Sequence, residues 1–278
     1  MGFIQLNIST DKAYVDIFMA ELGEIGFDSF EETEHGLAAY IAHENYNEAN
    51  VHEIFDRYKS TTNIDFSSQF IEKENWNELW EENYDPIEVE GRCRVRATFH
   101  EPQNQFPIEI VINPKMSFGT GHHATTWQMI KLMLDLDLEG KVVADLGCGT
   151  GILAVLAAIK GATQIEATDV DDWCVENSIE NFRLNGCEHI GIQKGSIEVV
   201  KFDQLFDVVL ANINKNVLLH EMHHYANMLK PNGQLLLSGF YHHDVEDITH
   251  KAGKYNLSLE SNIQKNDWAA LMLVKMNL

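Results

Sequence analysis

A glycine-rich loop with a carboxylate in front of it is the part of this sequence best suited to binding a ligand. The run 145–151 reads DLGCGTG and stands where a predicted strand, Lys141–Leu146, gives way to a predicted helix, Ile152–Lys160. Three alternate glycines let a backbone turn tightly and approach a ligand closely, so we predict that Gly147 and Gly149 contact one. Residues 149–154 also fit the dinucleotide pattern G-x-G-x-x-A, so the loop alone leaves NAD open.

Two carboxylates near this loop narrow the class of ligand. Asp145 directly precedes the first glycine, where it would repel a pyrophosphate but attract a cation. S-adenosylmethionine has no phosphate, and it carries an ammonium and a sulfonium. Asp169 ends the next predicted strand, 22 residues beyond Gly147, where an acid can accept two hydrogen bonds from a ribose diol. Both nucleotide and adenosyl cofactors place a ribose there, and Asp169 could instead cap the following helix.

Two further polar positions lie near predicted element ends. Residues 118–126, FGTGHHATT, form a second glycine-rich loop that leads into a predicted helix, Trp127–Leu134. The hydroxyls of Thr125 and Thr126 could simply cap that helix. Asn212 ends the predicted strand that begins at Phe206, and its amide oxygen could orient an amine without carrying charge. We therefore predict Asn212 as the catalytic positioning residue.

The run 220–224, HEMHH, matches the H-E-x-x-H signature of zinc hydrolases. On a helix, Leu218, Met222 and Tyr225 share one stripe, whereas His220 and His224 fall on the opposite face. No third ligand has the standard spacing. We therefore predict no metal site, and a zinc hydrolase is the weakest of the alternative functions.

The elements that must position these residues fall into two groups. Residues 1–71 follow the order β-α-β-β-α-β, which predicts a ferredoxin-like α+β domain that binds rather than catalyses. From residue 141 onward strands and helices alternate regularly, which predicts a mostly parallel α/β sheet with helices on both faces. Between them, residues 72–90 carry a net charge of -7, and Trp76 and Trp80 lie four apart on one face of a predicted linker helix. The predicted second domain is 91–278.

Charge and composition limit the possible partners. The chain has 43 acidic and 20 basic residues, a net charge of -23, of which -17 lies within residues 1–90. Such a surface repels nucleic acid, and the acidic first third suggests a basic partner. No apolar run is long enough to span a membrane, and the four cysteines include no C-x-x-C pair. We expect a soluble, cytoplasmic, reduced protein.

These motifs together resemble one family. The loops 118–126 and 145–151, Asp169, the run 209–213 (VLANI) and the runs 229–233 (LKPNG) and 237–239 (LSG) are similar to the bacterial PrmA-type ribosomal protein methyltransferases. The FGTG-x-H-x-TT loop is the specific element. The resemblance covers nearly the whole chain and implies a class I, Rossmann-like methyltransferase domain behind a ferredoxin-like domain.

The resemblance also implies a substrate and a site. Members of this family methylate protein eleven of the large ribosomal subunit, which the N-terminal domain recruits. By resemblance Thr126, Gly147, Asp169 and Asn212 would contact S-adenosylmethionine, and His123 would help to cover it. We therefore expect an S-adenosylmethionine-dependent protein N-methyltransferase acting on lysine or N-terminal amines of a basic ribosomal protein. A small-molecule methyltransferase and an NAD-binding oxidoreductase are the main alternatives.

Overall fold

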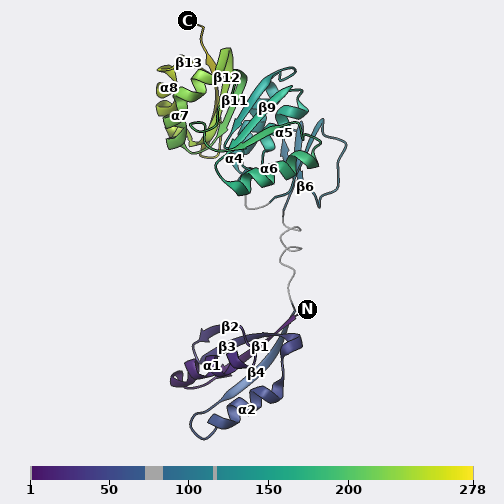
Figure 1. Ribbon diagram of the computed structural model, residues 1–278, viewed down its shortest axis with the longest axis vertical. Helices are drawn as coiled ribbons and strands as arrows, with labels where there is room; N and C mark the ends of the chain where they lie inside the picture. Colours follow the sequence, from purple (N-terminus) through teal and green to yellow (C-terminus); the bar gives the residue numbers. More distant parts are fainter. Residues whose placement is uncertain (1, 73–83, 115–117, 278) are drawn as a thin grey trace. The chain divides into compact units, whose positions relative to one another are not determined.

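The computed structural model describes residues 2–72, 84–114 and 118–277 and divides the chain into two compact units, Met1–Asn83 and Tyr84–Leu278 (Figure 1). Each unit has its own sheet and its own apolar core. In the part of the chain that is described, no helix is both long and apolar enough to cross a membrane.

The first unit is a four-stranded antiparallel sheet with two helices. Its strand order, β2-β3-β1-β4, is that of the split βαβ fold, as the sequence predicts. Alternate residues of β1, among them Leu6, are buried with Phe18 of α1 and Phe55 of α2, so both helices cover one face of the sheet. The elements are β1 (Gly2–Ser9), α1 (Val15–Glu24), β2 (Ser29–Thr33), β3 (Gly36–Ala42), α2 (Glu48–Tyr58) and β4 (Asp65–Glu72).

The second unit is built on a seven-stranded sheet in the order β10-β9-β8-β11-β12-β14-β13. Strand β14 is antiparallel to both of its neighbours, and all other pairs are parallel, which confirms the predicted mostly parallel α/β sheet. The strands are β8 (Val142–Leu146), β9 (Gln164–Asp169), β10 (Gly191–Lys194), β11 (Phe206–Asn212), β12 (Leu229–Tyr241), β13 (Leu257–Lys265) and β14 (Trp268–Lys275).

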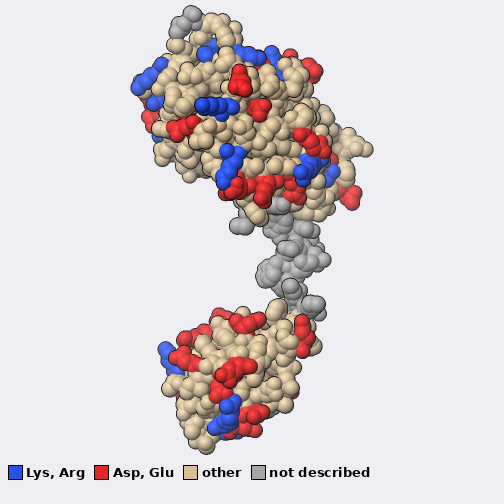
Figure 2. Space-filling model, viewed as in Figure 1, with Lys and Arg blue, Asp and Glu red and all other residues tan. Residues whose placement is uncertain are grey.

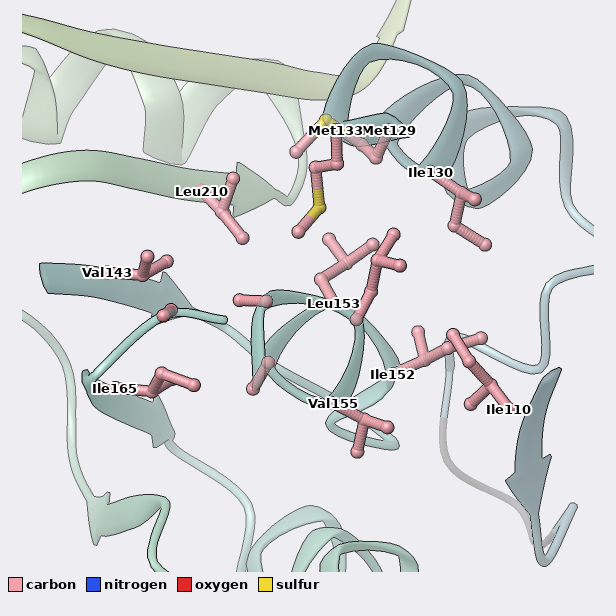
Figure 3. Close-up of a cluster of buried hydrophobic side chains, with 14 of the residues drawn as sticks. Ile110, Met129, Ile130, Met133, Val143, Ile152, Leu153, Val155, Ile165 and Leu210 are labelled. Atoms are coloured by element: carbon pink, nitrogen blue, oxygen red, sulfur yellow. The ribbon is translucent and has the colours of Figure 1, made fainter. Parts of the chain in front are cut away.

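Helices cover both faces of this sheet and enclose two cores. Residues of α4, α5 and α6 pack in one core, and residues of α7 and α8 pack in the other. In Figure 3, Leu153 of α5 lies between Val143 and Leu210 of the sheet and Met129 and Met133 of α4. The helices are α4 (Ala124–Asp135), α5 (Ile152–Ile159), α6 (Asp172–Leu184), α7 (Lys215–Met228) and α8 (Val245–Gly253).

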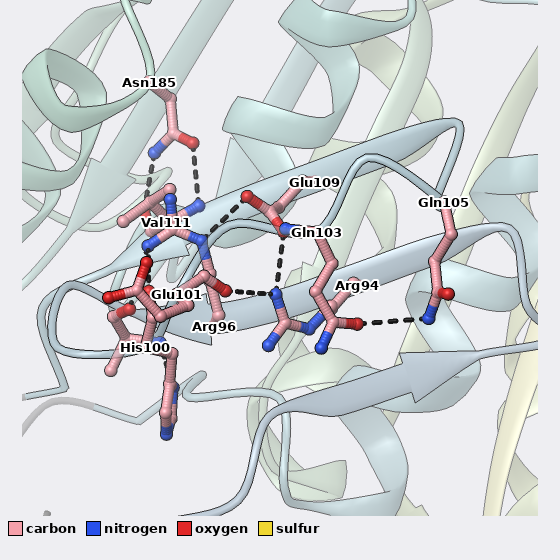
Figure 4. Close-up of polar contacts among 10 residues, drawn as sticks. Arg94, Arg96, His100, Glu101, Gln103, Gln105, Glu109, Val111 and Asn185 are labelled. Atoms are coloured by element: carbon pink, nitrogen blue, oxygen red, sulfur yellow. Dashed lines mark hydrogen bonds and ion pairs between the residues drawn. The ribbon is translucent and has the colours of Figure 1, made fainter.

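A small sheet, β5-β6-β7, completes the second unit (β5 Ile87–Val89, β6 Cys93–Ala97, β7 Ile108–Ile112). Glu109 joins two nearly buried arginines, accepting from Arg94 Nη1 at 2.9 Å and from Arg96 Nε at 2.7 Å (Figure 4). Asn185, just after α6, bonds to both backbone groups of Val111 at 2.9 and 2.6 Å. The two bonds of Asn185 fix the small sheet against the larger α/β part of the unit.

The structure differs from the sequence-based expectation at two places. The second unit begins at Tyr84 rather than at residue 91, because β5 lies inside the predicted linker and pairs with β6. Trp76 and Trp80 lie outside the described residues. The run 230–233 predicts a turn ahead of a strand at 234–238, but strand β12 begins at Leu229. Leu229 pairs with Phe206 and Gln234 pairs with Val208, so residues 230–233 bulge out of the strand.

Candidate active site

A cavity of about 700 Å³ lies where the parallel strands of the second unit end. Its lining comes from the segments that follow β8, β9, β10 and β11, together with loop 118–123 and residues of α7, β12 and β14. The carboxyl edge of such a sheet is where open α/β folds bind their ligands. Four of the predicted site residues line this cavity: Gly147, Gly149, Asp169 and Asn212.

The two glycine-rich loops lock together at one side of the cavity. Thr150 donates from its backbone nitrogen to the Phe118 carbonyl at 2.9 Å and from its hydroxyl to the Gly119 carbonyl at 2.7 Å. Gly149 has a φ of 58°, and a Cβ there would lie 2.2 Å from the Phe118 carbonyl oxygen. Only glycine fits this position, so the loop sequence is needed for the closure of the two loops as well as for approach to a ligand.

Asp169 is held at the cavity by backbone groups. One carboxylate oxygen accepts from Gly149 N at 2.9 Å, and the other accepts from Asp171 N at 3.1 Å. Because each carboxylate oxygen can accept two hydrogen bonds, both retain a lone pair for a ligand hydroxyl. The fixed carboxylate thus presents two acceptors side by side, which suits a vicinal diol.

Asp145 lies behind the cavity rather than in its wall, so the expectation that it faces a cationic ligand is not met. Its side chain is fully enclosed, and one oxygen accepts from Ala154 N at 3.1 Å in the first turn of α5. The other oxygen has no hydrogen-bond partner in the described part of the chain. Burial, with a smaller contribution from the nearby Asp169, raises the pKa of Asp145 to about 7.

Asn212 and Thr126 form a pair of which only Asn212 lines the cavity. Asn212 Nδ2 donates to the Thr126 hydroxyl at 3.4 Å, while Thr126 itself is fully buried. Asn212 Oδ1 is buried and has no partner among the described residues. An unsatisfied buried acceptor is costly in a folded protein, so this oxygen is suited to receive a donor from a ligand.

Glu221 is a charged residue of the cavity that sequence reasoning missed. Although it belongs to the H-E-x-x-H run, it lies on the inner side of α7, 8% exposed, and accepts from the Tyr225 hydroxyl at 2.5 Å. His220 points to solvent and contacts Glu198 at 2.9 Å. The described residues contain no cluster of three or more side chains arranged to hold a metal. The sequence held one signal for Glu221. Tyr225 lies on the buried stripe of the helix, and Glu221 lies one helical turn before it on the same side.

The charged side chains that the structure describes around the cavity have one sign. Its described lining includes the carboxylates of Asp169, Asp171 and Glu221 and neither lysine nor arginine. His123 also lines it, and burial lowers the pKa of this imidazole, which favours its neutral form. Such a cavity attracts a cationic ligand and disfavours a pyrophosphate.

Comparisons with known proteins agree with this geometry. A family model described as "Ribosomal protein L11 methyltransferase (PrmA)" matches residues 6–276. The chain is 40% identical over 279 residues to the ribosomal protein L11 methyltransferase of Phocaeicola vulgatus, with 99% of both proteins covered. It is 42% identical over 267 residues to the protein of that name from Porphyromonas gingivalis, covering 95% of this chain and 92% of that one.

Solved structures give the same result for the fold. The ribosomal protein L11 methylase of Lactobacillus delbrueckii subsp. bulgaricus matches with a TM-score of 0.65 and 26% identity, covering 70% of this chain and 100% of that one. A methyltransferase from Pyrococcus furiosus matches with a TM-score of 0.52 and 16% identity over 60% of this chain and 90% of that one, which shows the fold alone. The second unit therefore has a class I methyltransferase fold.

Proposed function

The chain belongs to the PrmA family of ribosomal protein L11 methyltransferases, and on that premise we propose that it methylates amines of ribosomal protein L11 with S-adenosylmethionine. The observation that supports the choice of cofactor is the cavity at the carboxyl edge of the sheet, where the charged lining residues that the structure describes are all acidic. S-adenosylmethionine carries two positive charges and one carboxylate, whereas NAD carries a pyrophosphate. A ribosomal substrate supports a cytoplasmic location for the enzyme.

The residues present fit this cofactor. The two acceptor oxygens of Asp169 suit the ribose diol, and the backbone at Gly147 and Gly149 allows close approach of the ligand. The acidic lining suits the ammonium and the sulfonium. When bound, S-adenosylmethionine supplies a methyl carbon activated by its positively charged sulfur.

Asn212 is the residue that we propose positions the amine. Its unpartnered Oδ1 can accept one N–H of a neutral amine and so turn the nitrogen lone pair toward the methyl carbon. The bond from its Nδ2 to Thr126 fixes which way the amide faces, so Thr126 acts through Asn212. Asn212 carries no charge and therefore does not hold the amine in its protonated form.

The amine must lose its proton before it reacts. At pH 7 this costs about 4.6 kcal/mol for a lysine with a pKa near 10.4, and about 1 kcal/mol for an α-amine near 7.7. Desolvation of the amine in the cavity would lower the cost for lysine. Both lysine and N-terminal amines are therefore chemically accessible to the same site.

The first unit is the proposed recruiting domain for the substrate. Among its described residues 2–72 there are fourteen acidic side chains and three basic ones. Opposite charge on a ribosomal protein would speed the encounter between the two proteins. The proposed division of labour assigns recruitment to residues 1–71 and catalysis to the second unit, which begins at Tyr84.

Calorimetry separates the cofactor alternatives. We expect S-adenosylhomocysteine, the demethylated product, to release heat on binding to the full chain, and NAD to release none at the same concentration. Heat with NAD alone would instead favour the oxidoreductase. Binding of S-adenosylhomocysteine without any methylation of L11 would favour a small-molecule methyltransferase.

A further inference from the structure

Glu221 is a carboxylate inside the cavity to which the proposed reaction gives no role. It is 8% exposed, and it accepts from the hydroxyl of the fully buried Tyr225 at 2.5 Å. A carboxylate has about four acceptor positions, so one hydrogen bond leaves room for donors from a ligand. A ligand that fills the cavity excludes water from Glu221 and must offer it a donor, because a buried charge without partners is costly.

The packing of α7 places Glu221 at the side of the cavity that follows β10. Ser196 and Ile197, which come after this strand, line the cavity, and Ile197 packs against the core that contains the inner side of α7. Between the same two segments His220 Nε2 lies 2.9 Å from Glu198 Oε1. The inner side of α7, with Glu221 on it, therefore adjoins the segment after β10.

The order of the strands indicates which part of a cofactor can reach this side. Along the sheet the order is β10-β9-β8-β11, with Asp169 at the end of β9 and Asn212 at the end of β11. In the proposed function the ribose lies at Asp169 and the methyl carbon near Asn212. Because the sulfur and the base are attached to opposite ends of the ribose, the base then extends from Asp169 away from Asn212, toward the segment after β10.

This side of the cavity has the surfaces that a purine needs. Val170, Ile197 and Val217 offer apolar side chains to the faces of a flat ring. Glu221 lies one turn after Val217 on the same side of α7, and it offers acceptors to the edge of such a ring. The Tyr225 hydroxyl keeps its proton and continues to hold the carboxylate, because burial, with a smaller contribution from Glu221, raises the pKa of Tyr225 above its ordinary value.

We propose that Glu221 accepts a hydrogen bond from the exocyclic amine of the adenine base, and that it thereby selects adenosyl cofactors over those with a 6-oxopurine base. This inference rests on the proposed function and adds to it the residue that distinguishes the base. The amine of adenine donates two N–H groups, whereas a 6-oxopurine presents a carbonyl oxygen at the same position. An ionised carboxylate cannot donate, so it attracts the first and repels the second. Tyr225 contacts Glu221 rather than the base and is a positioning residue.

The test measures by calorimetry how much more tightly the full chain binds S-adenosylhomocysteine than S-inosylhomocysteine, which has the 6-oxopurine base. We expect a ratio of about fiftyfold for the unaltered chain. In Glu221→Gln the amide keeps an acceptor for the Tyr225 hydroxyl, and its NH2 group can donate to the carbonyl oxygen, so the ratio should fall about tenfold. Glu198→Gln makes the same charge change in the neighbouring segment, outside the described lining of the cavity, and should leave the ratio unaltered.

A second variant serves if circular dichroism shows that Glu221→Gln does not fold. Replacing both partners of a buried hydrogen bond by apolar side chains of similar shape costs little stability. The double variant Glu221→Met/Tyr225→Phe should therefore fold, and its ratio should also fall about tenfold. A purely structural role of Glu221 would weaken the binding of both ligands equally and leave the ratio unaltered.

The outcomes separate this inference from the proposed function. Equal binding of the two ligands by the unaltered chain, or an unaltered ratio in the Glu221 variants, would overturn the inference and leave the proposed function intact. A ratio that falls in Ser196→Ala alone would assign the amine to Ser196 and overturn the inference as well. An unaltered chain that binds neither ligand would overturn the proposed cofactor itself.

Discussion

The two units of this protein use acidic residues in opposite ways. In the first unit the acids lie on the surface, and Figure 2 shows acidic side chains outnumbering basic ones on the visible face of the smaller unit. In the second unit both signs occur on the surface, while a few carboxylates are buried in or behind the cavity. Surface charge is screened by salt and mainly changes how fast partners meet, whereas buried charge selects the ligand.

The difference teaches where the specificity of such an enzyme resides. Asp145 is fully enclosed and accepts from Ala154 N in α5, and Asp169 is 9% exposed and accepts from Gly149 N. Glu32 and Glu34 of the first unit are exposed. We expect changes to the buried carboxylates to act on stability and cofactor binding, and changes to the exposed ones to act only on association with the substrate.

The largest effect should come from removing the charge of Asp145. Because its pKa is raised from 3.8 to about 7, the folded state holds a proton that the unfolded state has lost, and stability falls as the pH rises through this interval. This pKa shift corresponds to a loss of about 4 kcal/mol in the free energy of unfolding at most. The Asp145→Asn variant cannot ionise at this position. In urea unfolding without ligand, we expect its free energy of unfolding to exceed that of the unaltered chain by more at pH 8 than at pH 5. Asp172→Asn, at an exposed carboxylate, is the control, and equal gains at both pH values would contradict the account.

The second effect concerns cofactor binding. Asp169→Ala removes both acceptors for the ribose diol and the carboxylate that holds the backbone of Gly149. Hydrogen bonds to charged groups contribute about 1.5 to 3 kcal/mol, so we expect calorimetry to show about a hundredfold weaker binding of S-adenosylhomocysteine. Asp172→Ala should bind the ligand as the unaltered chain does. Similar binding by both variants would remove Asp169 from the site.

The third effect isolates the close contact between the two glycine-rich loops. Gly149 and Gly140 both have a positive φ, 58° and 70°, but a Cβ at Gly140 meets nothing within 4 Å. Gly140→Ala therefore reports backbone strain alone, and Gly149→Ala adds the clash with Phe118. We expect Gly149→Ala to cost about 2 kcal/mol more in the free energy of unfolding and to weaken cofactor binding as well. Equal costs for the two variants would show that the loops do not need to lock.

The smallest effect should come from the surface of the first unit. The double variant Glu32→Gln/Glu34→Gln should slow association with L11 a few-fold at about 0.05 M salt and hardly at all at about 0.5 M. Stopped-flow or surface binding kinetics would measure this. Glu246→Gln/Glu260→Gln makes the same charge change on the second unit and should leave the association rate unaltered. An association rate with L11 that does not change with salt concentration would contradict electrostatic recruitment.

Regular apolar spacing made most of the fold predictable. The apolar spacing of residues 48–58 predicts a helix, and α2 has these bounds because Val51, Ile54 and Phe55 lie on one buried face. Helix α8 was missed, since only Ile248 and Ala252 of its nine residues are buried and they form too weak a pattern. Short strand β5 was missed because its pairing with β6 is a tertiary contact.

The sequence motifs predict which residues belong to the site, but not which of them face the cavity. The glycine-rich loop, Asp169 and Asn212 stand at strand ends, where sequence reasoning can place them. Which residues face the cavity depends on packing between distant segments. Thr126 is therefore found behind Asn212, Asp145 behind the cavity wall, and Glu221 within it. The contribution of these residues to binding and catalysis stays a prediction.

One measurement tests the central claim most directly: the mass of purified ribosomal protein L11 after incubation with the full chain and S-adenosylmethionine. The account predicts that L11 gains whole methyl masses, and that Asn212→Ala slows this gain about a hundredfold or more while S-adenosylhomocysteine still binds. L11 of unchanged mass, in the presence of a chain that binds S-adenosylhomocysteine, would contradict it.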